Sequence, residues 1–249
     1  MSHSVQQAIA ALSLPPEWRW HVDVRRRRST LGIEVAPDGR VLFAVPADAD
    51  PTDVALAVRK RLPRLAEEVR RRGERPPEPV KELVSGSSFA YLGRRYRLRL
   101  IPVEDGRRVR LYGGWLELPD YASPEKSVQA IAAWYTERGT AWMRARLPSL
   151  QSRVGVTPKA IEVRALPDHW GSCGPDGVVT LHWAVMQLPP PLLDFVLVHE
   201  LCHLKVPGHG PAFRREMRLV LQDADHRERW FAVDEPMLWR GQVRPRIGR

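Results

Sequence analysis

Two short stretches near the N-terminus, Gly32–Val35 and Val41–Val45, are rich in apolar residues, with Pro37-Asp38-Gly39 between them. In the first stretch the polar Glu34 alternates with Ile33 and Val35. A period of two is typical of a half-buried strand, and a turn sequence between two such stretches predicts a β-hairpin. Apolar residues then recur at helical spacing from Val54 to Val69, directly after Asp50, a residue type that caps helix N-termini. The N-terminal part is therefore expected to combine strands with at least one helix.

The same patterns continue to the C-terminus. They predict, in order, two or three strands within residues 89–119, a long helix over 123–147, strands over 161–166 and 178–183, a helix after the prolines at 189–191, and a helix from about residue 211. The fold class is α+β. We expect a basic, β-rich N-terminal region with helices over residues 1–120, a second domain over 121–238, and a basic, weakly ordered tail over 239–249.

Composition places the chain among soluble globular proteins. Its 249 residues are 43% hydrophobic and 27% charged, and it has two cysteines, fewer than a secreted disulfide scaffold normally uses. No apolar run is long enough to cross a bilayer, and the first residues lack the basic-then-apolar order of a signal peptide. These observations predict a cytoplasmic protein with no membrane segment.

Positive charge is concentrated in the N-terminal part. Residues 1–150 carry 26 Lys and Arg against 18 Asp and Glu, whereas residues 151–249 carry 13 against 11. The arginine clusters are Arg25–Arg28, Arg70–Arg72 and the series Arg94, Arg95, Arg97 and Arg99. Such clusters suit nucleic-acid phosphates or acidic protein surfaces. A solvated strand face in an arginine-rich protein gives the same pattern, so the sequence leaves nucleic-acid binding open.

The strongest chemical signal is the segment His199-Glu200-Leu201-Cys202-His203. Histidines at i and i+4 lie on one face of a helix, so both imidazoles can reach one metal ion while Glu200 stands beside it. His209 follows after Pro207-Gly208, a sequence that ends a helix and can turn the chain back. Three neutral imidazoles and a water form the open site that catalytic zinc adopts.

An ordinary helix with hydrogen-bonded histidines is the alternative interpretation. The preceding run Leu192–Val198 is apolar almost all round, however, which predicts a buried helix in which Glu200 would be costly without a partner. Cys202 points about 100° away from His203 around the helix, so we expect it to be a packed apolar residue rather than a ligand. We therefore predict a Zn²⁺ site of His199, His203 and His209.

Together with Trp170-Gly171-Ser172-Cys173 and the proline-rich lead-in, this segment resembles the YgjP-like metallopeptidase family of metal-dependent hydrolases, bacterial relatives of the SprT-like zincins. The resemblance covers about residues 20 to 235. It implies that residues 121–238 form a zincin-like metallopeptidase domain with an HExxH helix. It also implies that His199, His203 and His209 are zinc ligands and that Glu200 is the catalytic glutamate, the general base and then the general acid of peptide hydrolysis.

Other residues near the motif are candidates for substrate binding. The segment Trp170–Cys173 can line the cleft and pair with an extended peptide, or Trp170 can simply pack against the metal-binding helix. The family usually has a basic residue before this segment and an asparagine before the tryptophan of the next strand, where this chain has His169 and His182. Either histidine can carry protons or contact substrate, or be an ordinary hydrogen-bonded residue.

The preferred function is thus a cytoplasmic zinc metallopeptidase acting on a peptide or protein. A metal-dependent nucleotide phosphohydrolase is one alternative, since the basic region would supply phosphate contacts. A nucleic-acid- or protein-binding module with a non-catalytic metal site is another. Glu200 argues against the module, because a structural site has no use for a carboxylate beside an open coordination position.

Overall fold

The structure is a computed structural model that describes residues 2–25, 30–35, 40–73, 78–104, 106–121, 123–167 and 169–244. The fold is mixed α and β, as expected, and the chain divides into two compact units, Met1–Pro76 and Pro77–Arg249. Arg26, Arg27 and Arg28, and the side chains of Arg25, Arg71 and Arg72, lie outside the described part. The nucleic-acid prediction made for those two clusters is thus not addressed by the structure.

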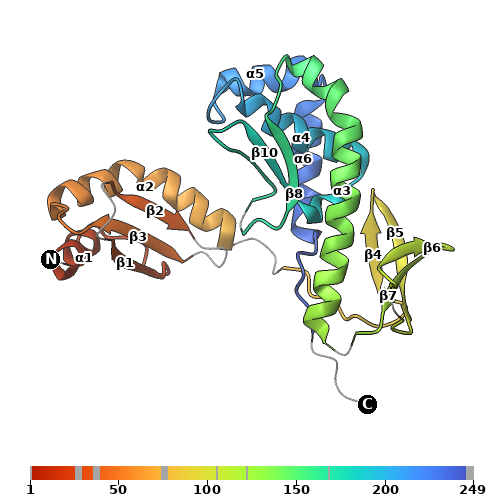
Figure 1. Cartoon of the computed structure of the whole chain (residues 1–249). Coiled ribbons are helices and arrows are strands. Elements are labelled where there is room, and N and C mark those ends of the chain that lie inside the picture. Colours follow the sequence, from red (N-terminus) through yellow and green to blue (C-terminus); the bar gives the residue numbers. More distant parts are fainter. Residues whose placement is uncertain are drawn as a thin grey trace. The chain divides into compact units, whose positions relative to one another are not determined.

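The first unit packs two helices with one small sheet (Figure 1, red to orange). Its elements are α1 (Ser2–Ala10), β1 (Trp20–Arg25), β2 (Gly32–Val35), β3 (Val41–Pro46) and α2 (Pro51–Gly73). The central strand β3 pairs antiparallel with β2, as the hairpin prediction requires, and parallel with β1. Asp50 caps α2 by accepting hydrogen bonds from the backbone N–H groups of Thr52 and Asp53.

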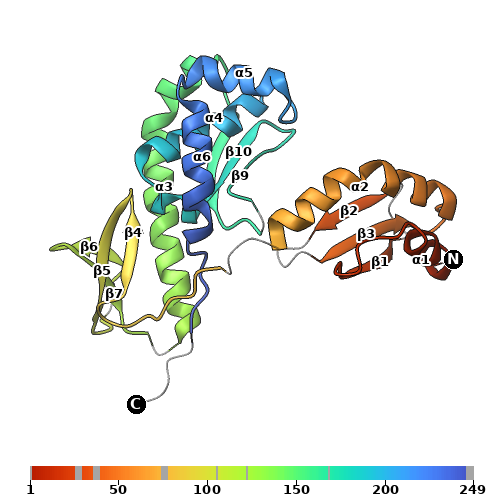
Figure 2. The same cartoon turned by 180° about the vertical axis from the view of Figure 1, so that it is seen from behind.

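The second unit contains two sheets joined by one long helix (Figures 1 and 2). Its elements are β4 (Ser88–Tyr91), β5 (Arg94–Ile101), β6 (Arg110–Tyr112), β7 (Trp115–Pro119), α3 (Pro124–Val154), β8 (Ala160–Arg164), β9 (Gly171–Cys173), β10 (Val178–His182), η1 (Trp183–Gln187), α4 (Pro190–His203), α5 (Pro211–Val220), α6 (Ala224–Asp234) and η2 (Glu235–Met237). The strand orders are β4-β5-β7-β6 and β8-β10-β9. The short strand β9 is therefore an edge strand.

The boundary between the units differs from the division expected near residue 120. Strands β4 to β7 pack in the same unit as α3, because their inner face meets its aromatic side chains. The ring of Tyr91 lies 4.9 Å from that of Trp134, and the Tyr135 hydroxyl donates a hydrogen bond to the Ala90 carbonyl. These contacts join residues about 45 positions apart, which neither composition nor periodicity reveals.

The prediction of a weakly ordered tail from residue 239 is wrong for the first residue of that tail. Trp239 is fully buried, and its ring packs edge-on against those of Phe89 and Trp183. Its backbone N–H and carbonyl are both bonded to the side chain of Gln187. A large aromatic ring buries enough apolar surface to order this segment. Residues 245–249 lie beyond the described range.

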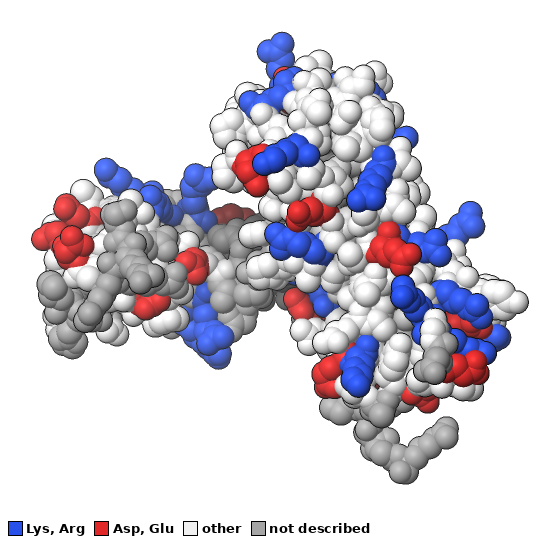
Figure 3. Space-filling view, viewed as in Figure 1, with Lys and Arg blue, Asp and Glu red and all other residues white. Residues whose placement is uncertain are grey.

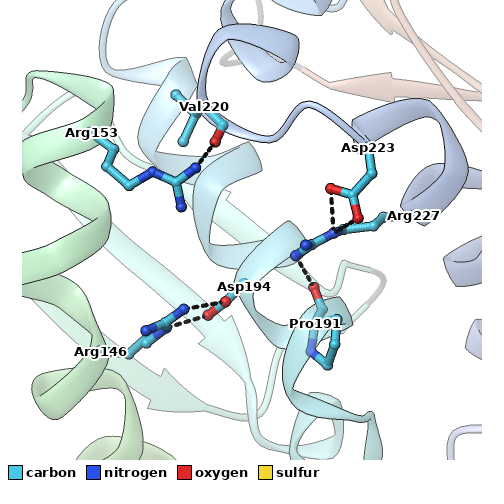
Figure 4. A network of polar contacts seen from close by, with 7 residues as sticks. All are labelled: Arg146, Arg153, Pro191, Asp194, Val220, Asp223 and Arg227. Carbon is cyan, nitrogen blue, oxygen red and sulfur yellow. Dashed lines mark hydrogen bonds and ion pairs between the residues drawn. The ribbon is translucent and has the colours of Figure 1, made fainter.

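Helix α4 is held on two sides by arginines (Figure 4). Arg146 on α3 donates two hydrogen bonds to Asp194 on α4, from Nε to Oδ1 at 2.7 Å and from Nη2 to Oδ2 at 2.6 Å. Arg227 on α6 donates to the carbonyl of Pro191 in the first turn of α4 at 2.9 Å. The first two turns of this helix are thereby tied to α3 and α6.

The segment after α4 is anchored as well. Arg153 on α3 donates to the carbonyl of Val220 at the end of α5 (Figure 4). Lys205, just after α4, donates to the carbonyl of Val154 at 3.2 Å and pairs with Glu216 on α5 at 2.9 Å. Lys205 thus holds the start of the turn that carries His209, and Arg153 holds the far end of the helix that follows this turn.

Candidate metal centre

Helix α4 carries His199 and His203 one turn apart at its C-terminal end, and His209 comes from the turn before α5. Gly208 has φ of +77°, in the left-handed region that glycine adopts without strain, and this lets the chain fold back after α4. The predicted role of Pro207-Gly208 thus has a structural basis. The turn thus brings the imidazole of His209 next to that of His199, ten residues earlier in the chain.

The Nε2 atoms of the three imidazoles lie close together. The distances between Nε2 atoms are 3.0 Å for His199 and His209, 3.2 Å for His199 and His203, and 3.2 Å for His203 and His209. Two nitrogens that ligate one tetrahedral ion at ~2.0–2.1 Å are about 3.3 Å apart. Among the described residues, these three histidines form the group whose ligand atoms lie close enough together to hold one metal ion. Their geometry therefore fits a metal ion.

The protonation of these rings also suits a metal ion. Burial, and then the neighbouring imidazoles, lower the pKa of His199 to about 3, and burial lowers the pKa of His203 as well. The Nδ1 atom of His203 lies 3.3 Å from the carbonyl of Val206. A carbonyl only accepts, so this contact places the proton on Nδ1 and leaves a lone pair on Nε2.

Phe213 contacts the rings of all three histidines. It is buried on α5, and its ring stacks on that of His203 with centroids 4.5 Å apart. Its centroid lies 4.8 Å from that of His199 and 5.1 Å from that of His209. No local pattern signals this contact, because it depends on how α5 folds back over α4.

Glu200 lies on the buried side of α4, with 6% of its surface exposed. Burial raises the pKa of its carboxyl to about 7. Gly171 in β9 lies against it, because a β-carbon at residue 171 would come within 2.5 Å of Oε1 and 2.7 Å of Cγ of Glu200. The strand approaches this closely only without a side chain. Gly171 of the Trp170–Cys173 segment is thus the residue that lies against Glu200.

The other members of that segment have different surroundings. Trp170 donates from Nε1 to Glu235 at 2.5 Å, and the guanidinium of Arg240 lies over its ring at 4.7 Å. Its side chain thus packs against the C-terminal segment. Cys173 is half-buried, and burial raises the pKa of its thiol, with Glu200 as the next cause. Ser172 lies opposite Thr180 in the antiparallel pair of β9 and β10.

The two extra histidines are not part of the triad. His182 is buried, and its Nδ1 accepts a hydrogen bond from the N–H of Ala184 at 3.0 Å, so it caps η1. Burial, and then Arg240, lower the pKa of His182 to about 3, so its ring is neutral. His169 is exposed. Cys202 is fully buried, as expected for a packed residue.

A cavity of about 270 Å³ opens beside the triad. His199 and His209 border it on one side. Its apolar wall consists of Phe195, Phe213, Met217 and Ala224, and the charged residues around it are Arg214, Asp225 and Glu228. Several of these come from α6, a helix that the sequence analysis did not predict. A space of this size and lining is suited to one large apolar side chain.

Comparison with known proteins gives two matches. A family model, the YgjP-like metallopeptidase domain, matches residues 29–233. Among solved structures, the crystal structure of the metallopeptidase zymogen abylysin of Pyrococcus abyssi is similar, with 23% sequence identity, coverage of 39% of this chain and 99% of that chain, and a TM-score of 0.36. A search of curated proteins gave no match. Within the described residues, no helix has the length and apolar character that a membrane span needs.

Proposed function

The chain belongs to the YgjP-like metallopeptidase family of hydrolases, and from this membership we propose that it is a zinc-dependent peptidase with a zincin-like catalytic domain. The observation that carries the proposal is the convergence of the Nε2 atoms of His199, His203 and His209 within 3.2 Å of one another. The buried Glu200 follows His199 directly on the same helix, α4. Three neutral imidazoles form the donor set of many catalytic zinc sites. A zinc ion held there would acidify a water molecule and polarise the peptide carbonyl.

Glu200 is the proton carrier in this proposal. Its carboxylate takes a proton from the attacking water and returns it to the amine that leaves. A carboxyl with a pKa near 7 is suited to both transfers, because it is close to half ionised at neutral pH. Gly171 leaves room for this carboxyl, since a β-carbon at residue 171 would come within 2.5 Å of Oε1.

An extended substrate has a place to bind along β9. Among the described residues, this strand pairs with β10 on one side only, and a peptide could pair with its other edge by strand addition. Gly171 at its start is the residue that touches Glu200. The cavity beside His199 and His209 would take the side chain next to the cleaved bond, and its apolar wall favours a large apolar residue.

Metal analysis combined with a substrate profile tests the proposal. Full-length protein is stripped with a chelator, reloaded with zinc, and incubated with a defined peptide mixture and, separately, with nucleoside triphosphates. We expect one zinc per chain and cleaved peptide bonds that disappear with the metal. Release of phosphate from nucleotides without peptide cleavage would favour the phosphohydrolase. Stable zinc binding without hydrolysis of either class would favour a binding module.

A further inference from the structure

The outward face of the sheet β4-β5-β7-β6 carries a row of arginines. Along β5, Leu98 points into the core and is fully buried, and Tyr96 and Leu100 pack against the same core. The alternate residues Arg95, Arg97 and Arg99 are exposed. Side chains two apart on one strand are ~6.8 Å apart. This row therefore presents guanidinium groups at a spacing comparable with that of successive phosphates in an extended single strand.

Two aromatic rings lie on the same face. The strand register pairs Arg97 with Trp115 of β7, and Trp115 in turn with Tyr112 of β6. The guanidinium of Arg99 lies over the Trp115 ring at 4.5 Å, and that of Arg110 lies over the Tyr112 ring at 4.6 Å. Tyr112 is 61% exposed, which is unusual for so large a side chain. The rings of Tyr112 and Trp115 and the guanidinium groups stacked on them thus lie together on the outward face of the sheet.

Positive charge on this face of the sheet exceeds negative charge. Figure 3 shows Lys and Arg side chains gathered in the region of β5 to β7, with some Asp and Glu side chains among them. Glu117 of β7 is 5% exposed. Its carboxylate lies 2.9 Å from the guanidinium of Arg110 and 3.8 Å from that of Arg99, so one negative charge is paired with two positive charges. In the part of the chain that the structure describes, Arg95 and Arg97 have no ion pair. Burial lowers the pKa of the nearby Lys81, and repulsion from Arg95 lowers it further.

We propose that this face, Arg95, Arg97, Arg99, Arg110, Tyr112 and Trp115, binds single-stranded nucleic acid. The arginine row contacts the phosphates, and the exposed Tyr112 ring and the guanidinium planes stack on bases. A charged sheet surface with aromatic side chains is a common platform for unpaired strands, because every base has a face that can stack. Stacking distinguishes this ligand from an acidic polypeptide, which needs charge but no rings. The proposal rests on residues separate from the metal centre.

Binding of full-length protein to a fluorescent 15-nucleotide oligothymidylate, measured by anisotropy over a range of salt concentrations, tests the proposal. Arg95→Gln/Arg97→Gln removes the two unpaired charges. We expect affinity to fall about tenfold near 0.1 M salt, and the log–log salt slope to decrease by about 1.4, since each phosphate contact on a single strand contributes about 0.7. Arg144→Gln/Arg229→Gln, which removes two exposed arginines elsewhere in the same unit, is the charge-matched control and should change neither quantity.

Tyr112→Ala tests stacking separately from charge. We expect at least about fivefold weaker binding to the oligothymidylate and an unchanged salt slope. Binding to an abasic strand of the same length should not change. An equal loss in the charge-matched control, or full binding by the Arg95/Arg97 variant, would place the binding elsewhere and overturn the proposal. Equal competition by polyglutamate together with no effect of Tyr112→Ala would assign the face to an acidic protein instead.

Discussion

Gly171 and Glu200 are in direct contact, although one lies on an edge strand and the other on the helix that carries two of the three clustered histidines. A β-carbon at residue 171 would lie 2.5 Å from Oε1 of Glu200 and 2.8 Å from its Cδ, far inside van der Waals contact. The φ angle of Gly171 is not in the left-handed region, so glycine is needed here for space rather than for backbone conformation. The contact couples the position of β9 to the position of the carboxyl.

Gly171→Ala should therefore displace the Glu200 carboxyl and lower peptidase activity about 100-fold, the effect of misplacing a catalytic group by about 1 Å. Zinc content should remain near that of the native protein. Gly210→Ala is the matched control, because a β-carbon there meets nothing within 4 Å. Steady-state hydrolysis of a cleaved peptide, together with elemental analysis, measures both. Native activity in Gly171→Ala would show that this contact does not position the carboxyl.

Glu200→Gln should retain the fold and the metal and lose hydrolysis by a factor of about 10² to 10⁴, because the amide fills the same space but cannot accept a proton. Stability should stay the same or rise, since a neutral group is easier to bury than a carboxylate. Single-turnover peptide assays and thermal unfolding measure these effects. Loss of zinc along with activity would instead make Glu200 a ligand.

His209→Ala should weaken zinc binding by at least about 100-fold, more than the loss typical of a residue that only supports a ligand. The Nε2 atom of His209 is one of the three that converge, so two imidazoles would remain. Competition with a chromophoric chelator gives the affinity. His169→Ala, at an exposed histidine outside the triad, should bind zinc as the native protein does. Unchanged affinity in His209→Ala would remove it from the ligand set.

Ala224→Leu should change which peptides are cleaved. Ala224 is buried and lines the cavity beside His199, so a larger side chain reduces the space for substrate. We expect cleavage next to large apolar residues to fall about tenfold or more relative to cleavage next to small ones. Mass spectrometry of a digested peptide library measures the ratio. An equal fall for all peptides would mean that the cavity does not select the substrate.

Arg146→Met should destabilise the protein by roughly 1–3 kcal/mol, because it leaves Asp194 without its charged partner. Asp194 is 8% exposed, and both of its oxygens are bonded to Arg146. Replacing the pair, in Arg146→Met/Asp194→Leu, should recover most of the loss, since no unpaired charge then remains buried. Urea unfolding of the two variants gives the comparison. Two variants equally unstable would show that packing, rather than the charge, is responsible.

The sequence determined the parts of this protein that depend on local spacing. The interval of four between His199 and His203 places both rings on one face of α4, and Pro207-Gly208 ends the helix with a turn. The hairpin and the Asp50 cap are local in the same sense, since each needs only neighbouring residues. Short-range geometry follows from bond angles and hydrogen bonding, and a pattern of residue types can specify it.

Only the tertiary structure decided the contacts between distant segments. The support of the imidazoles by Phe213, the fit of Gly171 against Glu200, and the burial of Trp239 beside Phe89 join residues that periodicity treats as unrelated. The same is true of the boundary at residue 76, since the inner face of β4 packs on a helix that begins about 30 residues later. Many small packing energies, summed over the whole unit, select these pairs, and no single residue type encodes them.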